Sequence, residues 1–212
     1  MRSIIIIFLP LLLPVVLQAQ LLTDTSSVTR QCSAIRELVY QATNRQFEDI
    51  TESEAKTSYG HQTLGTWQFS TTRYNANFQW ADASKCYIEY NEESTDSFKN
   101  QTWQYIAEYS RLPNVIEAER LYRQLNIQIG GCRYPLTDSV EVDFIPLPLD
   151  RLPPERPAAL EVASMYELPT AEALAKNQSP INVMVGMEKR QKDYRVSLIV
   201  EYRKTLTPGP SP

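Results

Sequence analysis

Three cysteines and one histidine are the side chains of this chain best suited to covalent or metal chemistry. Cys86 and His61 could form a nucleophile and its base, because a thiol attacks as the thiolate that a neighbouring base helps to create. A zinc site takes three or four Cys, His or carboxylate ligands, and a lone histidine falls short of that set. The sequence also lacks serine-triad, phosphate-loop and His-Glu metalloprotease motifs. We therefore predict no metal and no cofactor, and we keep a Cys/His hydrolase as an alternative.

Two groups of acidic residues could do general acid–base chemistry. The first group is Glu48, Asp49, Glu52 and Glu54, and the second is Glu92, Glu93 and Asp96. A glycoside hydrolase holds two carboxyl groups about 5 to 9.5 Å apart in a cleft. Spacing in the sequence does not give that separation, so a carboxylate hydrolase stays an alternative to solvated loop charges.

Five aromatic residues could form a platform for sugar rings or a peptide. They are Trp67, Trp80, Trp103, Tyr105 and Tyr109. Each is predicted to share an alternating face with Phe69, Phe78 or Ile88, where a sheet meets its helices. The pattern therefore favours core packing, and a carbohydrate-binding module is the second alternative.

The spacing of apolar residues predicts the elements that position these side chains. A helical stripe predicts one helix over residues 28–46, and alternation with period two predicts strands near 67–70, 77–80, 86–90 and 103–109. Asn114 is a candidate N-cap for a second helix, which Gly130 and Gly131 would end. Its predicted buried stripe consists of Val115, Ala118, Leu121, Tyr122, Leu125 and Ile129.

The second half of the sequence predicts more strands. One strand is expected near 140–144, a proline-rich connector over 146–157, a short helix after Pro169, and a closing hairpin of 181–187 with 194–202. We expect one α+β domain over residues 20–204, followed by a disordered tail, 205–212. Its predicted fold is a two-layer sandwich, with an antiparallel sheet of about five or six strands and two main helices on one face.

The cysteines also have a structural interpretation. Cys32 lies near the start of the first predicted helix, and Cys132 lies just beyond the second. Because both helices should cover the same face, a Cys32–Cys132 disulfide is the preferred pairing in an oxidising compartment. Three reduced or buried thiols are the alternative.

A binding surface is predicted on the face of the sheet opposite the core. Alternation places Tyr87, Ile106 and Ile199 there, among polar residues able to form hydrogen bonds. Such a mixed face could hold a protein partner. An ordinary wetted sheet surface is the simpler alternative.

The N-terminal residues predict export. Arg2, the apolar run 4–17 and the small residue Ala19 have the three-part layout of a secretory signal peptide over residues 1–19. The run is shorter than the roughly 20 residues that span a bilayer, so we expect no stable membrane insertion after cleavage. A formal net charge of −4 argues against nucleic acid as a partner. We therefore expect a periplasmic or extracellular, non-enzymatic domain that binds an unidentified protein or peptide.

The mature protein is predicted to begin at Gln20, because Ala19 follows the apolar run as the small residue at the cleavage site. Intact-mass measurement of exported material should give the mass of residues 20–212. A mass that retains Met1 to Ala19 would contradict the prediction.

Overall fold

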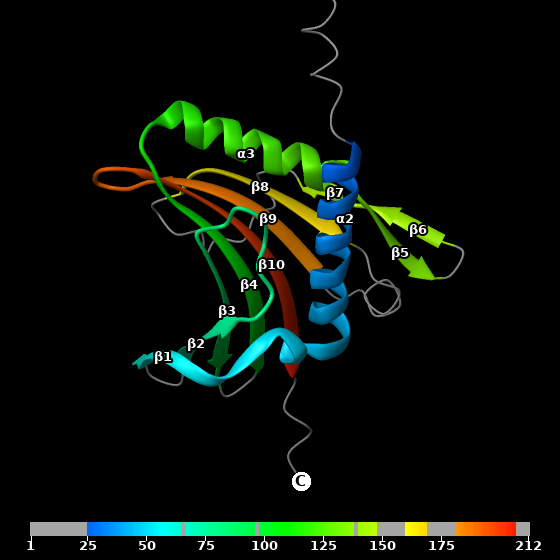
Figure 1. Cartoon of the computed structure of the whole chain (residues 1–212). Coiled ribbons are helices and arrows are strands. Elements are labelled where there is room, and N and C mark those ends of the chain that lie inside the picture. The colour runs from blue at the N-terminus through cyan, green and yellow to red at the C-terminus, as the bar shows by residue number, and fades with distance from the viewer. Residues whose placement is uncertain are drawn as a thin grey trace, which may run out of the picture.

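The computed structural model describes residues 25–64, 67–95, 98–137, 140–147, 160–168 and 181–206 (Figure 1). The predicted signal peptide, most of the proline-rich connector and the short helix expected after Pro169 lie outside these residues. The first predicted helix is confirmed as α2, Thr25–Tyr40, which continues as a π-helical turn, η2, Gln41–Arg45. A 3₁₀ turn, η3, Glu48–Ile50, follows.

Within the described residues, eight antiparallel strands form the main sheet, in the order β1-β2-β3-β4-β10-β9-β8-β7. The strands are β1 Thr51–Leu64, β2 Trp67–Ala76, β3 Lys85–Ser94, β4 Lys99–Leu112, β7 Ile145–Leu147, β8 Leu160–Leu168, β9 Ile181–Lys189 and β10 Tyr194–Leu206. A separate hairpin consists of β5, Arg133–Thr137, and β6, Val140–Asp143. The α+β class is confirmed, but the sheet is larger than the five or six strands predicted.

The strand order divides the main sheet into two four-stranded meanders. Strands β1 to β4 follow α2, and strands β7 to β10 follow the second helix, α3, Val115–Gly130. The two meanders meet where β4 pairs with β10, with Ile106 opposite Ile199. The middle of the sheet therefore depends on contacts between residues almost a hundred positions apart in sequence.

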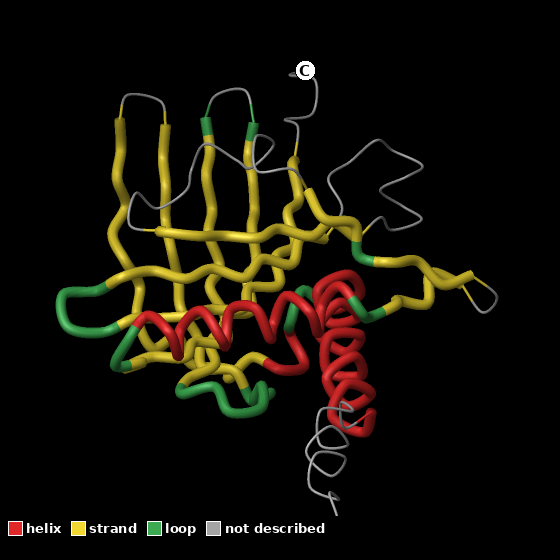
Figure 2. The backbone as a smooth tube through the Cα atoms, turned by 90° about the horizontal axis from the view of Figure 1, so that it is seen from above, coloured by secondary structure: helices red, strands yellow, loops and turns green. Residues whose placement is uncertain are grey.

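Both helices contribute to one core on one face of the sheet. Figure 2 shows α3 lying across the strands, with α2 near one end of it. The Asn114 side chain caps α3 by accepting a hydrogen bond of 3.0 Å from the Glu117 amide, as predicted. Buried side chains from α2, α3 and the central strands fill the core, among them Leu38, Val39, Ala118, Leu125, Ile129, Tyr105, Val185 and Leu198.

Three segments differ from the sequence prediction. Residues 77–80 form a loop instead of a strand, because the hydroxyl groups of Tyr105 and Tyr109 donate hydrogen bonds to the carbonyls of Phe78 and Ala81, at 3.1 and 2.9 Å. Residues 160–168, whose composition left them unassigned, form β8 between β7 and β9. Strand β10 also continues through Thr205 and Leu206, into the predicted tail.

The ends of the main sheet have features that discourage pairing with another chain. Edge strand β1 is interrupted by three register irregularities, and edge strand β7 has only three residues, including Pro146. Bulges, short length and proline all weaken an edge as a template for another strand. The faces of this sheet are therefore better candidates for binding than its edges.

The predicted Cys32–Cys132 disulfide is confirmed, with the two Cα atoms 5.3 Å apart. It ties α2 to the second residue after the end of α3, near the point where Figure 1 shows the two helices meeting. The third cysteine, Cys86, is buried and free. The disulfide therefore joins the two helix-and-meander units on the helical side of the sheet.

Replacement of Cys32 and Cys132 by Ser should lower the free energy of unfolding by up to about 4 to 5 kcal/mol, because the disulfide closes a loop of 100 residues. Urea unfolding with and without a reducing agent measures the loss. Reduction should destabilise the wild type and leave the double variant unchanged. Equal stability of the oxidised and reduced wild type would contradict the prediction.

Candidate functional site

The three residues predicted to bind a partner lie side by side on the far face, which we define as the face of the main sheet that points away from the α2–α3 core. Tyr87 on β3 is opposite Ile106 on β4, and Ile106 is opposite Ile199 on β10. The row continues through Met184 on β9 to Met165 on β8. We call these five residues the apolar row.

The apolar row is only partly accessible. Tyr87, Ile106 and Met165 expose 4%, 6% and 6% of their surface, while Ile199 and Met184 are half-buried. Tyr87 and Ile106 therefore add less exposed apolar area than the sequence suggested. The Tyr87 ring is covered because the Arg73 guanidinium lies 4.2 Å from its centroid and the Lys85 ammonium lies 5.0 Å from it.

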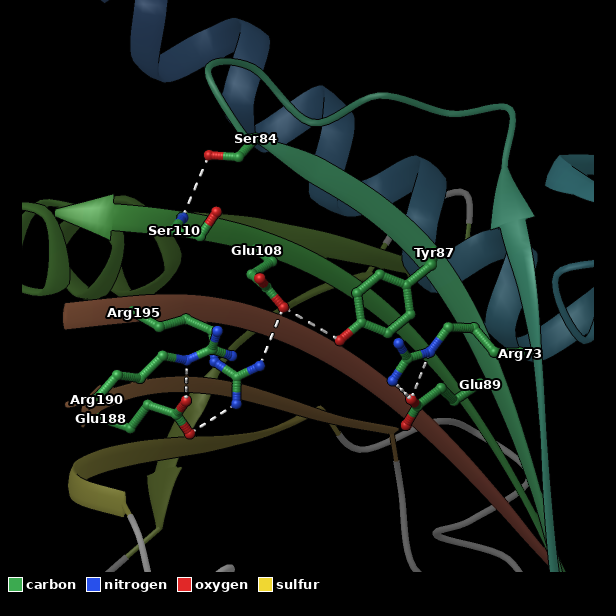
Figure 3. Close-up of polar contacts among 9 residues, drawn as sticks. All are labelled: Arg73, Ser84, Tyr87, Glu89, Glu108, Ser110, Glu188, Arg190 and Arg195. Carbon is green, nitrogen blue, oxygen red and sulfur yellow. Dashed lines mark hydrogen bonds and ion pairs between the residues drawn. The ribbon is translucent and has the colours of Figure 1, made fainter. Parts of the chain in front are cut away.

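A group of charged residues borders the apolar row at one end of the strands (Figure 3). Arg195 forms ion pairs with Glu188 at 2.6 Å and with Glu108 at 3.0 Å. Arg190 forms another with Glu188 at 2.9 Å, and the Tyr87 hydroxyl makes a long hydrogen bond of 3.5 Å to Glu108. We call Glu108, Glu188, Arg190 and Arg195 the charged cluster.

The electrostatic environment keeps the Glu188 carboxylate and the Arg195 guanidinium ionised. Burial alone would raise the pKa of Glu188, but hydrogen bonds from Arg195 and Arg190 outweigh it and hold the pKa below its usual value. Burial also opposes the charge on Arg195, whose pKa is nevertheless raised because Glu188 and Glu108 stabilise the cation. Burial and the Glu89 carboxylate raise the pKa of Tyr87 to about 12, so its hydroxyl stays protonated.

The other side of the apolar row carries a second line of polar groups. Arg73 pairs with Glu89 across β2 and β3, with its Nε atom 2.9 Å from the carboxylate. Further along, Glu201 accepts hydrogen bonds from Gln104 at 2.8 Å and from Asn182 at 3.4 Å. The far face is therefore an apolar centre between two lines of charged and amide side chains.

The structure does not place the backbone of His61 beside Cys86. His61 lies in β1, between positions paired with Thr71 and Phe69. Thr71 pairs with Asn91, and Cys86 lies five residues, about 16 Å, further along β3. Cys86 itself is buried, and its sulfur accepts a hydrogen bond of 3.4 Å from the Trp80 amide.

Three members of the acidic groups, Asp49, Glu52 and Glu92, have structural partners that the structure describes. Asp49 pairs with Arg45 at 3.5 Å, and Glu52 accepts a hydrogen bond of 2.8 Å from Asn75. The hydrogen bonds from Lys99 and Tyr90 lower the pKa of Glu92. A general acid needs a raised pKa, so Glu92 is tuned in the opposite direction. Glu54 and Asp96 have side chains outside the described part of the chain.

The described members of the aromatic platform for sugars lie in the core or against it. Trp80, Tyr105 and Tyr109 expose 3%, 0% and 6% of their surface and belong to the core, while Trp103 is half-buried against it. The Trp67 side chain lies outside the described residues. The core-packing interpretation is therefore confirmed for the described members of this set.

The described residues contain no group of three or more His, Cys, Asp or Glu side chains placed to hold a metal ion. Within the same residues, every helix is too short or too polar to cross a membrane. Comparisons of the chain with known protein families, curated proteins and solved structures give no match.

The sequence prediction missed two of the five residues of the apolar row, Met184 and Met165. Met184 alternates with Val183 and Val185 on β9, so the period-two pattern already contained its position. Met165 could not be placed, because residues 160–168 carried no clear strand signal. The pairing of Arg195 with Glu108 joins residues 87 positions apart, which no local pattern reveals.

Replacement of Glu188 by Gln should lower the free energy of unfolding by about 1 to 3 kcal/mol at pH 7, because it weakens charged hydrogen bonds to Arg195 and Arg190. The pKa of Glu188 is lowered on folding, so its contribution is present above the unfolded-state pKa and lost as the pH falls through the folded-state pKa. The difference from wild type should therefore shrink below about pH 4.

Urea unfolding at pH 7 and pH 3 measures the effect. Asp143→Asn is the matched control, because Asp143 also pairs with an arginine but is 64% exposed, so its loss should cost under about 1 kcal/mol. Equal costs for the two variants at pH 7 would contradict the role of the charged cluster.

Proposed function

We propose that this chain is an exported, non-enzymatic domain that binds a polypeptide segment across the far face of its main sheet. The observation that carries the proposal is the apolar row, which crosses five strands in the middle of a face that neither α2 nor α3 covers. On a solvated sheet face, these positions would normally be polar.

The chemistry of the face favours a polypeptide. Ile199 and Met184 are the half-buried members of the row, and methionine adapts its shape to varied apolar partners. The amides of Gln104 and Asn182 and the charged cluster can hydrogen-bond to polar groups beside them. An extended peptide supplies such groups alternately, since successive side chains point to opposite sides.

Other ligand classes fit this face less well. The arginines beside the row are already paired with Glu89, Glu108, Glu188 and Glu201, so they offer less attraction to the phosphate groups of a nucleic acid. A sugar-binding platform requires accessible aromatic rings, and Tyr87, the aromatic member of the row, is covered. The hydrolase alternatives have weaker support, because the structure does not place Cys86 beside the backbone of His61.

Selection from a displayed library of random peptides of about 12 residues provides the probe. Peptides selected on the mature protein are synthesised, and their affinities are measured by fluorescence anisotropy. Replacement of Ile199 and Met184 by Ser should weaken binding by about tenfold or more, because each substitution removes apolar area at the centre of the contact. The half-buried pair is chosen because substitution of the buried Tyr87 or Ile106 would also disturb folding.

Lys204→Ser is the matched control, since Lys204 is exposed on the same strand and its side chain alternates to the other face. Circular dichroism and thermal unfolding establish that each variant is folded. Failure to select any peptide, or equal affinity for wild type and the double variant, would refute the proposal. Binding of a glycan array that the same double variant abolishes would favour the carbohydrate alternative instead.

A further inference from the structure

Helix α3 carries a second surface that faces away from the sheet. Ile116, Arg120, Arg123 and Ile127 follow one another at positions i, i+4, i+7 and i+11, so they form a single line along the helix. Ile116 and Ile127 expose 75% and 74% of their surface. Figure 1 shows α3 on the outside of the molecule, above the sheet. We call these four residues the outward stripe.

Local helix stability does not account for the two isoleucines. Isoleucine is a poorer helix former than alanine, leucine, lysine or glutamate, so an exposed position gains no local stability from it. Burial does not account for them either, because Ala118, Leu125 and Ile129 already face the core. The outward stripe therefore combines two exposed apolar side chains with two arginines for no reason internal to the fold.

The arginines of the outward stripe are weakly compensated by their own helix. Arg123 pairs with Glu119 at 4.0 Å, the limit for an ion pair, and the two side chains are 76% and 51% exposed. An exposed pair of this kind contributes under about 1 kcal/mol, so Arg123 can exchange it for a carboxylate on another molecule. The stripe thus presents positive charge between two apolar ends.

A second copy of this chain would be a poor partner. The order Ile, Arg, Arg, Ile is the same in both directions, so antiparallel pairing of two α3 helices would place Arg120 against Arg123. Parallel pairing about a two-fold axis would place each arginine against its own copy. Like charges that face each other across an interface are unfavourable. The surface that meets the outward stripe must therefore differ from α3 itself.

An anionic membrane is also a poorer fit than a protein. Interfacial helices bury a broad apolar face, whereas the broad apolar face of α3 is already in the core. The outward stripe offers two apolar side chains, about 16 Å apart along the helix. The full chain has a net charge of −4, which disfavours approach to an anionic surface.

We propose that the outward stripe docks an acidic amphipathic helix of another protein. The matching helix carries apolar residues at i and i+11, and Asp or Glu at i+4 and i+7. Its carboxylates then meet Arg120 and Arg123, while its apolar side chains cover Ile116 and Ile127. This surface lies on the opposite side of the sheet from the apolar row, and the proposal does not depend on the proposed function.

Two alanine-based peptides of about 18 residues provide the probe, a length at which such sequences are partly helical. One carries two Leu and two Glu at the stated positions, and the other has Lys in place of both Glu. Fluorescence anisotropy at low salt should show about tenfold tighter binding of the Glu peptide to the mature protein. Replacement of Ile116 and Ile127 by Ser should weaken that binding.

The charge-reversed variant, Arg120→Glu with Arg123→Glu, distinguishes charge recognition from loss of structure. It should no longer bind the Glu peptide and should bind the Lys peptide instead, a reversal that simple loss of structure cannot produce. The replaced side chains are exposed, so circular dichroism and thermal unfolding should match those of wild type. Absence of Glu-peptide binding at millimolar concentration, or a preference that charge reversal leaves unchanged, would overturn the proposal.

Two further measurements test the other possible occupants of the outward stripe, which are a membrane surface and a second copy of this chain. Co-sedimentation with vesicles of phosphatidylcholine and phosphatidylglycerol in equal parts should show no binding that depends on Arg120 and Arg123. Sedimentation equilibrium should show no dimer that dissociates when Ile116 and Ile127 become Ser. A positive result in the first assay would assign the stripe to a membrane surface, and in the second to self-association, and either would overturn the proposal.

Discussion

Pairing between β4 and β10 is the constraint on which the rest of the sheet depends. It joins the two meanders, in continuous register from Tyr109 opposite Val196 to Lys99 opposite Leu206. A slip of one residue would turn Ile106 toward the helices and Tyr105, which is fully buried, toward the far face. The tight core on one side therefore enforces the register that aligns the apolar row on the other.

On the far face, the charged cluster links the three central strands of the sheet, β4, β10 and β9. Arg195 on β10 reaches Glu188 on β9 and Glu108 on β4 at the same time, which requires both pairings to be in register. Removing these groups from water has a desolvation cost, so such a cluster contributes more to the choice of one register than to total stability. Replacement of only one member leaves a partly buried charge without its full set of partners.

Sequence patterns identified the elements whose burial is one-sided and missed those that form through pairing. The period-two pattern identified β3, β4, β9 and β10, and the N-cap of α3 at Asn114 was correct. Strand β1 is polar along most of its length and forms by pairing with β2. Phe78 and Trp80 alternate as in a strand, yet they sit in a loop that tyrosine hydroxyls hold. The sequence located Tyr87, Ile106 and Ile199 of the apolar row, because they lie on strands with a clear period-two pattern. It did not locate Met165, because the strand that carries this residue lacks such a pattern.

The outward stripe was visible in the sequence as an exception. Ile116 and Ile127 fall outside the helical stripe of apolar residues that predicted the buried face of α3, and the structure places both in solvent. Because the sheet and the core separate α3 from the far face, the two surfaces share no side chains. Substitutions on one surface should therefore leave binding at the other unchanged, as expected for sites without shared partners. The disulfide at the end of α3 holds the helix against α2, so the stripe is presented on a fixed support.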